Sequence, residues 1–342
     1  MPRLTIRQHG ASASIPRHPI AGNLQKPEER KANRGWTAAV ARRNSQYLQR
    51  IDFERVDGTP YAVTLTLPAW QMEQVTPVVM HRLIDVMIKY LRRHGMLHFH
   101  WIIEFTARRM PHIHMSVWMA DRYEEWDRHL RQYIVWDNNE SAVVSNVVVK
   151  WLELTEAEGL HTSSNSQDVQ LIDGNEAWLV YIAKHGIRGV KHYQRALDNM
   201  PDEWRDGAGA MWGHDRKMPV ADDSVLPMDM RAFHQFRREA RKWCCAHACM
   251  IKDPHRRAKA IGQARRSNRC CLPELSVVRP VSVWIPKDVT ISIVKGLRSR
   301  GYMIGWDAYQ WGVDELARLR DEGGSEERRR ILGKSLMEML RT

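Results

Sequence analysis

The sequence of 342 residues has few of the features that mark membrane or secreted proteins. No apolar run reaches the roughly 18 residues that a transmembrane helix needs, and residues 1–10 lack the apolar core of a signal peptide. The five cysteines are too few for a disulfide framework in a chain of this length. These absences argue against a membrane partner and a disulfide scaffold, and we expect a cytoplasmic protein with reduced thiols.

The cysteines are confined to one short stretch of the chain. They are Cys244, Cys245, Cys249, Cys270 and Cys271. With histidines nearby, these thiols could close a structural zinc site. Contiguous Cys-Cys pairs, however, stand where zinc modules usually carry Cys-x-x-Cys, so free thiols are the favoured interpretation and zinc is the alternative.

The charge balance is strongly basic and uneven. Lysine and arginine number 52 against 40 acidic residues, which makes the net charge +12 and the pI about 9.6. Residues 1–50 hold 10 basic residues against 2 acidic ones, and residues 231–270 hold 12 against 2. Aromatic residues such as Trp36 and Phe236 interleave with these charges and are suited to stacking on bases. A nucleic-acid partner is therefore favoured over the alternative of two solubilising tails.

Composition and apolar periodicity divide the chain into three parts. Residues 1–50 carry scattered proline, serine and arginine and are expected to form a flexible basic arm, with a helix from about 37 to 49. Residues 51–228 carry the patterns of a folded domain. Residues 229–342 are expected to form a basic, mostly helical region that binds DNA or has an accessory role.

The middle part predicts an alternating order of strands and helices. In chain order the patterns predict a strand at 61–67, a helix at 76–93, strands at 97–105 and 113–119, a helix at 121–136 and a strand at 143–154. This β-α-β-β-α-β order is that of the ferredoxin-like (RRM-like) fold. We therefore predict an α+β domain whose antiparallel sheet has helices on one face, followed by one more helix at about 175–185.

One short segment predicts a metal site. His112 and His114 are two apart in a predicted strand, so both imidazoles share a face. If the chain turns near Arg108, Glu104 lies opposite His112 on that face. Two imidazoles and a carboxylate suit a divalent ion such as Mg²⁺ or Mn²⁺. His98-Phe99-His100 has the same spacing, and strand parity places these two histidines on the Glu104 face as well, where they are expected to flank the site.

A second segment predicts a nucleophile. Tyr181 and Lys184 are three residues apart in the predicted helix at 175–185 and would be neighbours on one helix face. A tyrosine hydroxyl attacks phosphorus once a metal ion has polarised the phosphodiester, and an ammonium group steadies the added negative charge. An ordinary amphipathic helix with Tyr181 half buried is the alternative.

Taken together, these residues resemble a known family, the HUH endonucleases, and in particular the single-tyrosine rolling-circle replication initiators (Rep) of plasmids and small phages. Thr64-Leu65-Thr66 resembles the first family motif, and Glu104 with Pro111-His112-Ile113-His114 resembles the metal-binding second motif. Tyr181-Ile182-Ala183-Lys184 resembles the third motif, and Gly209-Ala210-Met211-Trp212-Gly213 the Gly-x-x-Trp-Gly element that often follows it. The resemblance covers about residues 60–215, and it identifies residues 51–228 as an HUH endonuclease domain.

The resemblance implies a defined reaction in a bacterial host. Tyr181 would attack single-stranded or hairpin origin DNA, form a 5′-phosphotyrosine intermediate and release a 3′-OH that primes a polymerase. His112, His114 and Glu104 would hold Mg²⁺ or Mn²⁺, and Lys184 would assist. Independently of the resemblance, the segregation of charge leads us to expect that residues 231–269 bind duplex DNA beside the nick.

Two further expectations concern the number of tyrosine nucleophiles and the partner proteins. No second tyrosine lies three or four residues from Tyr181, so the enzyme is expected to use one tyrosine. Leu332-Gly333-Lys334-Ser335 ends like a phosphate-binding loop, but Arg328 stands where the first glycine of that loop should be. Unwinding is therefore expected to come from a host helicase, and synthesis from a host polymerase.

Three alternatives remain open at the level of sequence. A single-tyrosine transposase or relaxase would use the same chemistry to move DNA rather than copy it. A non-catalytic nucleic-acid-binding regulator would explain the basic flanks and the sheet, and it predicts that the hydroxyl of Tyr181 is dispensable. A zinc-dependent hydrolase is disfavoured, because no segment resembles His-Glu-x-x-His.

Overall fold

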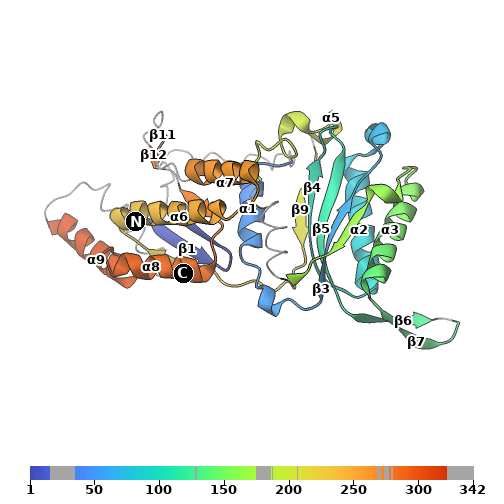
Figure 1. Ribbon diagram of the computed structural model, residues 1–342, viewed down its shortest axis with the longest axis horizontal. Coiled ribbons are helices and arrows are strands. Elements are labelled where there is room, and N and C mark those ends of the chain that lie inside the picture. The colour runs from blue at the N-terminus through green and yellow to red at the C-terminus, as the bar shows by residue number, and fades with distance from the viewer. Residues whose placement is uncertain are drawn as a thin grey trace. The chain divides into compact units, whose positions relative to one another are not determined.

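The chain folds into two compact units, each of which is described by itself (Figure 1). The computed structural model describes residues 1–15, 35–127, 129–174, 186, 188–205, 207–267, 271–272, 277–278 and 280–321. One unit, here the central unit, comprises residues 26–48 and 52–220. The other, the terminal unit, comprises residues 1–25, 49–51 and 221–342. Both contain helices and antiparallel sheets, which confirms the predicted α+β class.

The central unit is built on a five-stranded sheet. Its main elements are α1 (Ala38–Leu48), β3 (Thr59–Leu65), α2 (Pro77–Arg93), β4 (Met96–Phe105), β5 (Pro111–Met119), β6 (Arg122–Asp127), β7 (Gln132–Asp137), α3 (Glu140–Ala157), β8 (Asp168–Leu171), α5 (Asp202–Arg205) and β9 (Trp212–His214). The strand order is β8-β3-β5-β4-β9, and all the pairings are antiparallel. The elements β3-α2-β4-β5-α3-β8 therefore follow the predicted β-α-β-β-α-β order of a ferredoxin-like fold.

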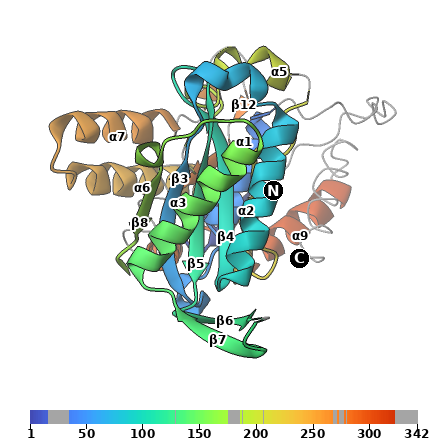
Figure 2. The ribbon, with the colours of Figure 1, turned by 90° about the vertical axis from the view of Figure 1, so that its right-hand side faces the viewer.

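Helices α2 and α3 lie side by side over one face of this sheet (Figure 2). Helix α2 begins where Thr76 accepts a hydrogen bond from the backbone N–H of Val79, and Pro77 occupies its first turn. Its buried residues recur at helical spacing and include Met80, Leu83 and Met87. They pack with the strand residues that face them, so one face of the sheet is apolar and closed by the helices. The polar residues of the strands are left on the other face.

Two predicted elements of this unit are wrong. The helix predicted at 121–136 is the β6–β7 hairpin, because the consecutive aromatic and β-branched residues Tyr133, Ile134, Val135 and Trp136 favour a strand and pair with residues 123–126. The strand predicted at 143–154 is helix α3. The valines there are β-branched, but the buried residues Val143, Val147, Trp151 and Thr155 recur every four positions, which is helical spacing. The fourth strand of the fold is instead β8, which the sequence did not reveal.

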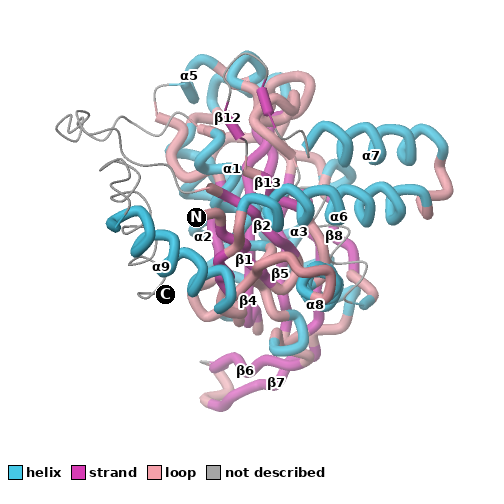
Figure 3. The backbone as a smooth tube through the Cα atoms, turned by 90° about the vertical axis from the view of Figure 1, so that its left-hand side faces the viewer, coloured by secondary structure: helices cyan, strands magenta, loops and turns pink. Residues whose placement is uncertain are grey.

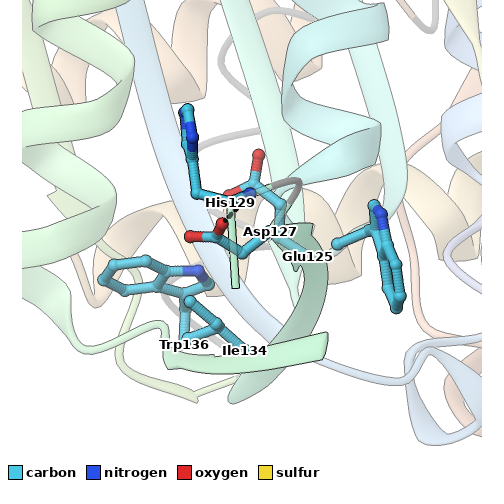
Figure 4. Close-up of a pocket in the computed structure, with 6 residues that line it drawn as sticks. Glu125, Asp127, His129, Ile134 and Trp136 are labelled. Carbon is cyan, nitrogen blue, oxygen red and sulfur yellow. Dashed lines mark hydrogen bonds between the residues drawn. The ribbon is translucent and has the colours of Figure 1, made fainter. Parts of the chain in front are cut away.

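The β6–β7 hairpin exposes aromatic side chains on a polar, acidic ribbon. Trp126 and Tyr133 form a cross-strand ring pair with centroids 5.0 Å apart, and they are 49% and 65% exposed. An open pocket on this hairpin is lined by Glu125, Trp126, Asp127, His129, Ile134 and Trp136 (Figure 4). The backbone N–H of His129 donates to Asp127, which shapes the turn. Carboxylates on this ribbon disfavour a phosphate backbone.

The terminal unit is built on a four-stranded sheet. Its elements are β1 (Arg3–Arg7), β2 (Gly10–Ser14), β10 (Ser224–Pro227), α6 (Met230–Cys249), α7 (Pro254–Ser267), β11 (Cys271–Leu272), β12 (Val277–Val278), β13 (Val281–Val283), α8 (Lys287–Arg298) and α9 (Trp306–Asp321). The order of the larger sheet is β10-β1-β2-β13, and its core includes Leu4, Phe233 and Leu297. Helices α6 and α7 run side by side (Figure 3).

This unit corrects the predicted division of the chain. Residues 1–50 were expected to form a flexible arm, but residues 3–14 form two strands of the terminal sheet. The physical reason is an alternation of apolar and polar residues, which is typical of a strand and which overall composition does not reveal. Leu4 and Ile6 alternate with polar residues, as do Ala11 and Ala13, and all four are buried. The region predicted at 229–342 is mainly helical as expected, yet its core needs these N-terminal strands. Helix α1 confirms the predicted helix at 37–49, and residues 16–34 lie outside the described residues.

None of the helices among the described residues is long and apolar enough to cross a bilayer.

Candidate metal centre

The candidate centre lies on the β4–β5 hairpin, on the sheet face opposite α2 and α3. A tight turn joins the two strands: the N–H of Thr106 donates to the carbonyl of Met110, and Arg109 adopts a positive φ of 63°. The antiparallel register places Glu104 directly opposite His112. His114 follows two residues later and is paired on its two sides with Ile102 and Thr64. Strand parity therefore brings all three predicted ligands to one face.

The three side chains converge on one point. One ligand atom from each of Glu104, His112 and His114 lies within 4.8 Å of the others. The two Nε2 atoms are 2.8 Å apart, and Nε2 of His114 is 3.8 Å from Oε2 of Glu104. Metal–nitrogen and metal–oxygen bonds of about 2.0–2.2 Å fit separations of this size. The donor set of two imidazoles and a carboxylate is thus sterically and chemically suited to a divalent ion.

The centre is largely shielded from water but open on one side. Glu104 is fully buried, His112 is 4% exposed and the side chain of His114 is 13% exposed. Oγ1 of Thr64 lies 3.1 Å from Nδ1 of His114, so β3 orients one imidazole. The open side of the centre is the exposed edge at His114.

Two arginines that the sequence did not reveal hold Glu104. Nε of Arg195 donates to Oε1 of Glu104 at 2.7 Å, and both side chains are fully buried. Nη1 of Arg188 donates to the other oxygen, Oε2. Burial lowers the pKa of the Arg195 guanidinium, while the adjacent Glu104 carboxylate acts in the opposite direction. No spacing rule links these arginines to Glu104, because they come from a loop about 80–90 positions away.

The loop that carries the arginines is fastened to the edge of β4. The carbonyl of Gln194 accepts from the N–H of Phe105 at 2.9 Å. The guanidinium of Arg195 also lies over the indole of Trp36, 3.9 Å from the ring centroid, and Nε1 of Trp36 donates to the carbonyl of Ile103. This stack and these hydrogen bonds fix the position of Arg195.

The second histidine pair does not join the centre. Nδ1 of His98 is 2.9 Å from Asp215, and Nε2 of His100 is 2.8 Å from Oδ1 of Asn44. The ring of His100 also stacks on Tyr47. Both imidazoles are therefore occupied by structural contacts, and the expectation that they flank the metal site is wrong.

The element resembling Gly-x-x-Trp-Gly forms β9, the edge strand beside β4. Gly213 lies opposite Trp101 in the register. A Cβ atom at position 213 would fall 2.7 Å from the Trp101 indole, so glycine is required for the two strands to pair here. The role of this element in the described structure is to complete the sheet next to the strand that carries Glu104.

The predicted nucleophile Tyr181 and its neighbour Lys184 lie outside the described residues. Their roles stay predictions, as does the helix predicted at about 175–185.

The cysteine cluster is described only in part. Cys244, Cys245 and Cys249 on α6 are free thiols. Cys270 lies outside the described residues, and so does the side chain of Cys271. The zinc alternative stays a prediction.

The described thiols differ in expected reactivity. Burial raises the pKa of the Cys244 thiol to about 11, so at neutral pH it is almost entirely the unreactive neutral form. Cys249 is exposed. We expect iodoacetamide to modify Cys249 at least about tenfold faster than Cys244, as followed by peptide mass spectrometry. Equal rates for the two thiols would contradict this description of α6.

Comparisons with known proteins show that the chain is similar to replication proteins of phages and bacteria. The sequence profile of the family described as "Replication-associated protein ORF2/G2P" matches residues 60–154, the segment that contains Glu104, His112 and His114. The chain is 30% identical over 270 residues to the replication-associated protein G2P of Pseudomonas phage Pf3, covering 78% of this chain and 87% of that protein.

Two bacterial proteins are also similar. A putative replication protein of Xylella fastidiosa strain 9a5c is 27% identical over 318 residues, which is 89% of this chain and 99% of that protein. A putative replication protein of Xylella fastidiosa strain Temecula1 is 28% identical over 282 residues, which is 79% of this chain and 94% of that protein. No solved structure matches the chain.

Proposed function

Because this chain belongs to the replication-associated protein ORF2/G2P family, we propose that it initiates rolling-circle replication by cutting one strand of origin DNA as an HUH-type endonuclease. The observation that carries the proposal is the convergence of Glu104, His112 and His114 on one face of the β4–β5 hairpin. That donor set supports metal-assisted phosphodiester cleavage. The net charge of +12 fits a polyanionic substrate.

The three residues have distinct tasks in the proposed reaction. His112 and His114 supply neutral imidazole nitrogens, and Glu104 supplies a carboxylate that balances the charge of Mg²⁺ or Mn²⁺. When bound, such an ion polarises a phosphate oxygen and stabilises the charge that develops on it. Thr64 keeps the ring of His114 in position through its contact with Nδ1. The burial of Glu104 excludes water from the back of the centre.

Tyr181 is the proposed nucleophile. Its hydroxyl releases a proton and the oxygen forms a bond to phosphorus, while the bond from phosphorus to the 3′ oxygen breaks and that oxygen takes up a proton to become a 3′-OH, so that no net proton is consumed. The product is a 5′-phosphotyrosine link, and Lys184 offsets the negative charge in the transition state. Arg188, which contacts Glu104, follows Tyr181 by seven residues, and a segment of that length spans at most about 25 Å. Chain connectivity therefore permits Tyr181 to reach the centre.

The proposed partners follow from the reaction. The 3′-OH is a primer for a host polymerase, and the strand must be opened by a host helicase, in the cytoplasm of a bacterial cell. Single-tyrosine transposases and relaxases share this chemistry, but the similar phage and bacterial proteins carry replication names. We therefore favour initiation over transposition or conjugation.

The test is a covalent trap. Single-stranded oligonucleotides from the protein's own replicon are incubated with Mn²⁺ and either the wild-type chain or Tyr181→Phe, then separated on a denaturing gel. We expect a protein–DNA adduct that requires the metal and is absent with Tyr181→Phe, with Tyr193→Phe as the matched control that retains it. Tight binding without an adduct, identical in all three proteins, would support a non-catalytic regulator instead.

The basic face of α6 is proposed to bind duplex DNA beside the nick. Arg238 and Arg241 are exposed on this helix, within the segment 231–270 that holds 12 basic residues against 2 acidic ones. Replacing both by glutamine should lower the slope of log K against log salt concentration by about 0.9 for each phosphate that is no longer neutralised. Arg55→Gln with Arg93→Gln, two exposed arginines of the other unit, removes the same charge and should leave the slope nearly unchanged. Equal slopes in the two double variants would contradict this role for α6.

A further inference from the structure

The two oxygens of Glu104 are bound by two arginines in different surroundings. We propose that Arg195 is a fixed positioning residue for Glu104, whereas Arg188 is an exchangeable cation that leaves Oε2 when the metal binds and then holds a phosphate of the DNA strand. This inference rests on the proposed function, because it assumes that Glu104 is a metal ligand.

Arg195 has the properties of a permanent support. Its side chain is fully buried, it donates to Oε1 at 2.7 Å, and it is stacked on Trp36. The oxygen that faces the imidazole of His114 is Oε2, so this hydrogen bond fixes the carboxylate through its other oxygen. A planar guanidinium between an indole and a carboxylate is preorganised, and it sets the direction in which Oε2 points.

Arg188 has the properties of an exchangeable group. It donates to Oε2, the same oxygen that lies 3.8 Å from Nε2 of His114 and would contact an ion held by the histidines. A guanidinium and a divalent cation at one carboxylate oxygen repel each other. The side chain of Arg188 is 14% exposed, so unlike Arg195 it has a path toward solvent.

The backbone around Arg188 permits this exchange. Its carbonyl accepts a hydrogen bond from Nη1 of Arg195, which anchors the main chain at this position. Residues 188 and 189 belong to no helix or strand, so no regular element constrains the rotamer of Arg188. Once displaced, the guanidinium would lie beside the metal, where a bidentate contact with a DNA phosphate is favoured.

The two arginines are therefore expected to affect metal binding in opposite directions. Removing the guanidinium of Arg188 removes a competitor for Oε2, so the dissociation constant for Mn²⁺ should fall. Removing that of Arg195 leaves Glu104 unsupported, so the dissociation constant should rise about 10- to 100-fold, as for other residues that orient a metal ligand. Loss of folding would weaken Mn²⁺ binding in both variants and cannot produce opposite signs.

The experiment is a Mn²⁺ titration of the full chain, followed by electron paramagnetic resonance of the free ion. The variants are Arg188→Gln, Arg195→Gln and the milder Arg195→Lys, with Arg205→Gln as the control, because Arg205 pairs with Asp202 on α5 rather than with a candidate ligand. We expect Arg188→Gln to bind Mn²⁺ at least about threefold more tightly than wild type. Arg195→Lys should fall between Arg195→Gln and wild type, and Arg205→Gln should match wild type.

A second measurement tests the destination of Arg188. In a Tyr181→Phe background, adding Arg188→Gln should weaken binding of single-stranded DNA with Mn²⁺ present, by more than it does without metal. Unchanged or weaker Mn²⁺ binding by Arg188→Gln, where wild-type binding still requires His114, would overturn the exchange and leave the proposed function standing. Mn²⁺ binding by wild type that survives His114→Ala would instead overturn the metal centre itself.

Discussion

Alanine at His114 is expected to lower the rate of metal-dependent DNA cleavage at least about 100-fold. The expectation follows from the position of this residue, because its Nε2 lies between the second imidazole and the carboxylate of the centre. Changes even to the partners of metal ligands cost about 10- to 100-fold in metal affinity or activity, so loss of a ligand should cost more. The measurement is the initial rate of oligonucleotide cleavage at a fixed Mn²⁺ concentration.

A histidine outside the centre provides the control. His161 is exposed and stacks on Trp70, so His161→Ala removes an imidazole without touching the candidate ligands. Its cleavage rate should stay within about twofold of wild type, as is usual for surface substitutions. If His114→Ala cleaved as fast as His161→Ala, the centre on β4 and β5 would not be the metal site.

Alanine at Glu104 is expected to cause the largest loss of stability of any single substitution in this site. Glu104 and Arg195 are both fully buried, and removing the carboxylate leaves the guanidinium of Arg195 uncompensated. Breaking such a buried pair on one side costs about 3–5 kcal/mol in the free energy of unfolding. Denaturant unfolding followed by tryptophan fluorescence measures the change.

The control for this substitution is Glu124→Ala on the exposed β6 strand, which should change the free energy of unfolding by no more than about 0.5 kcal/mol. A loss below about 1 kcal/mol for Glu104→Ala would contradict this expectation. It would show that the buried pair with Arg195 adds no more to the free energy of unfolding than a solvent-exposed ion pair usually does.

The convergence of the three candidate metal ligands was predictable from sequence because strands obey a simple geometry. Side chains two apart share a face, and a short turn after Glu104 returns the next strand antiparallel, so His112 must lie opposite it. The same parity rule led to the expectation that His98 and His100 flank the site. Parity assigns a face of the sheet, but the partners of each side chain, here Asp215 and Asn44, depend on segments that parity does not describe.

The arginines at Glu104 were not predictable for a physical reason. Arg188 and Arg195 reach the carboxylate from a loop, and a loop has no periodicity that would indicate which way a side chain points. Neither residue is close to Glu104 in sequence. Only the tertiary contacts, such as the hydrogen bond from the N–H of Phe105 to the carbonyl of Gln194, bring this loop to the strand.

The order of the fold was predicted although two of its elements were misassigned. The valine-rich residues 143–154 were predicted to form a strand because valine has a high β propensity. In the structure they form a helix, in which every fourth residue from Val143 to Thr155 is buried. That change moves the last strand to β8, a short and mostly exposed segment with weak signals. The ferredoxin-like order survives because the β6–β7 hairpin is an insertion between β5 and α3, outside the five-stranded sheet.

The most direct test of the account is to identify the residue that becomes linked to DNA. The covalent complex formed with Mn²⁺ is digested with trypsin and nuclease, and the nucleotide-bearing peptide is sequenced by mass spectrometry. The account predicts a 5′-phosphate nucleotide on the tyrosine of the peptide 151–184, in which Tyr181 is the only tyrosine. A nucleotide on Tyr193, on a serine or joined through a 3′-phosphate would contradict it.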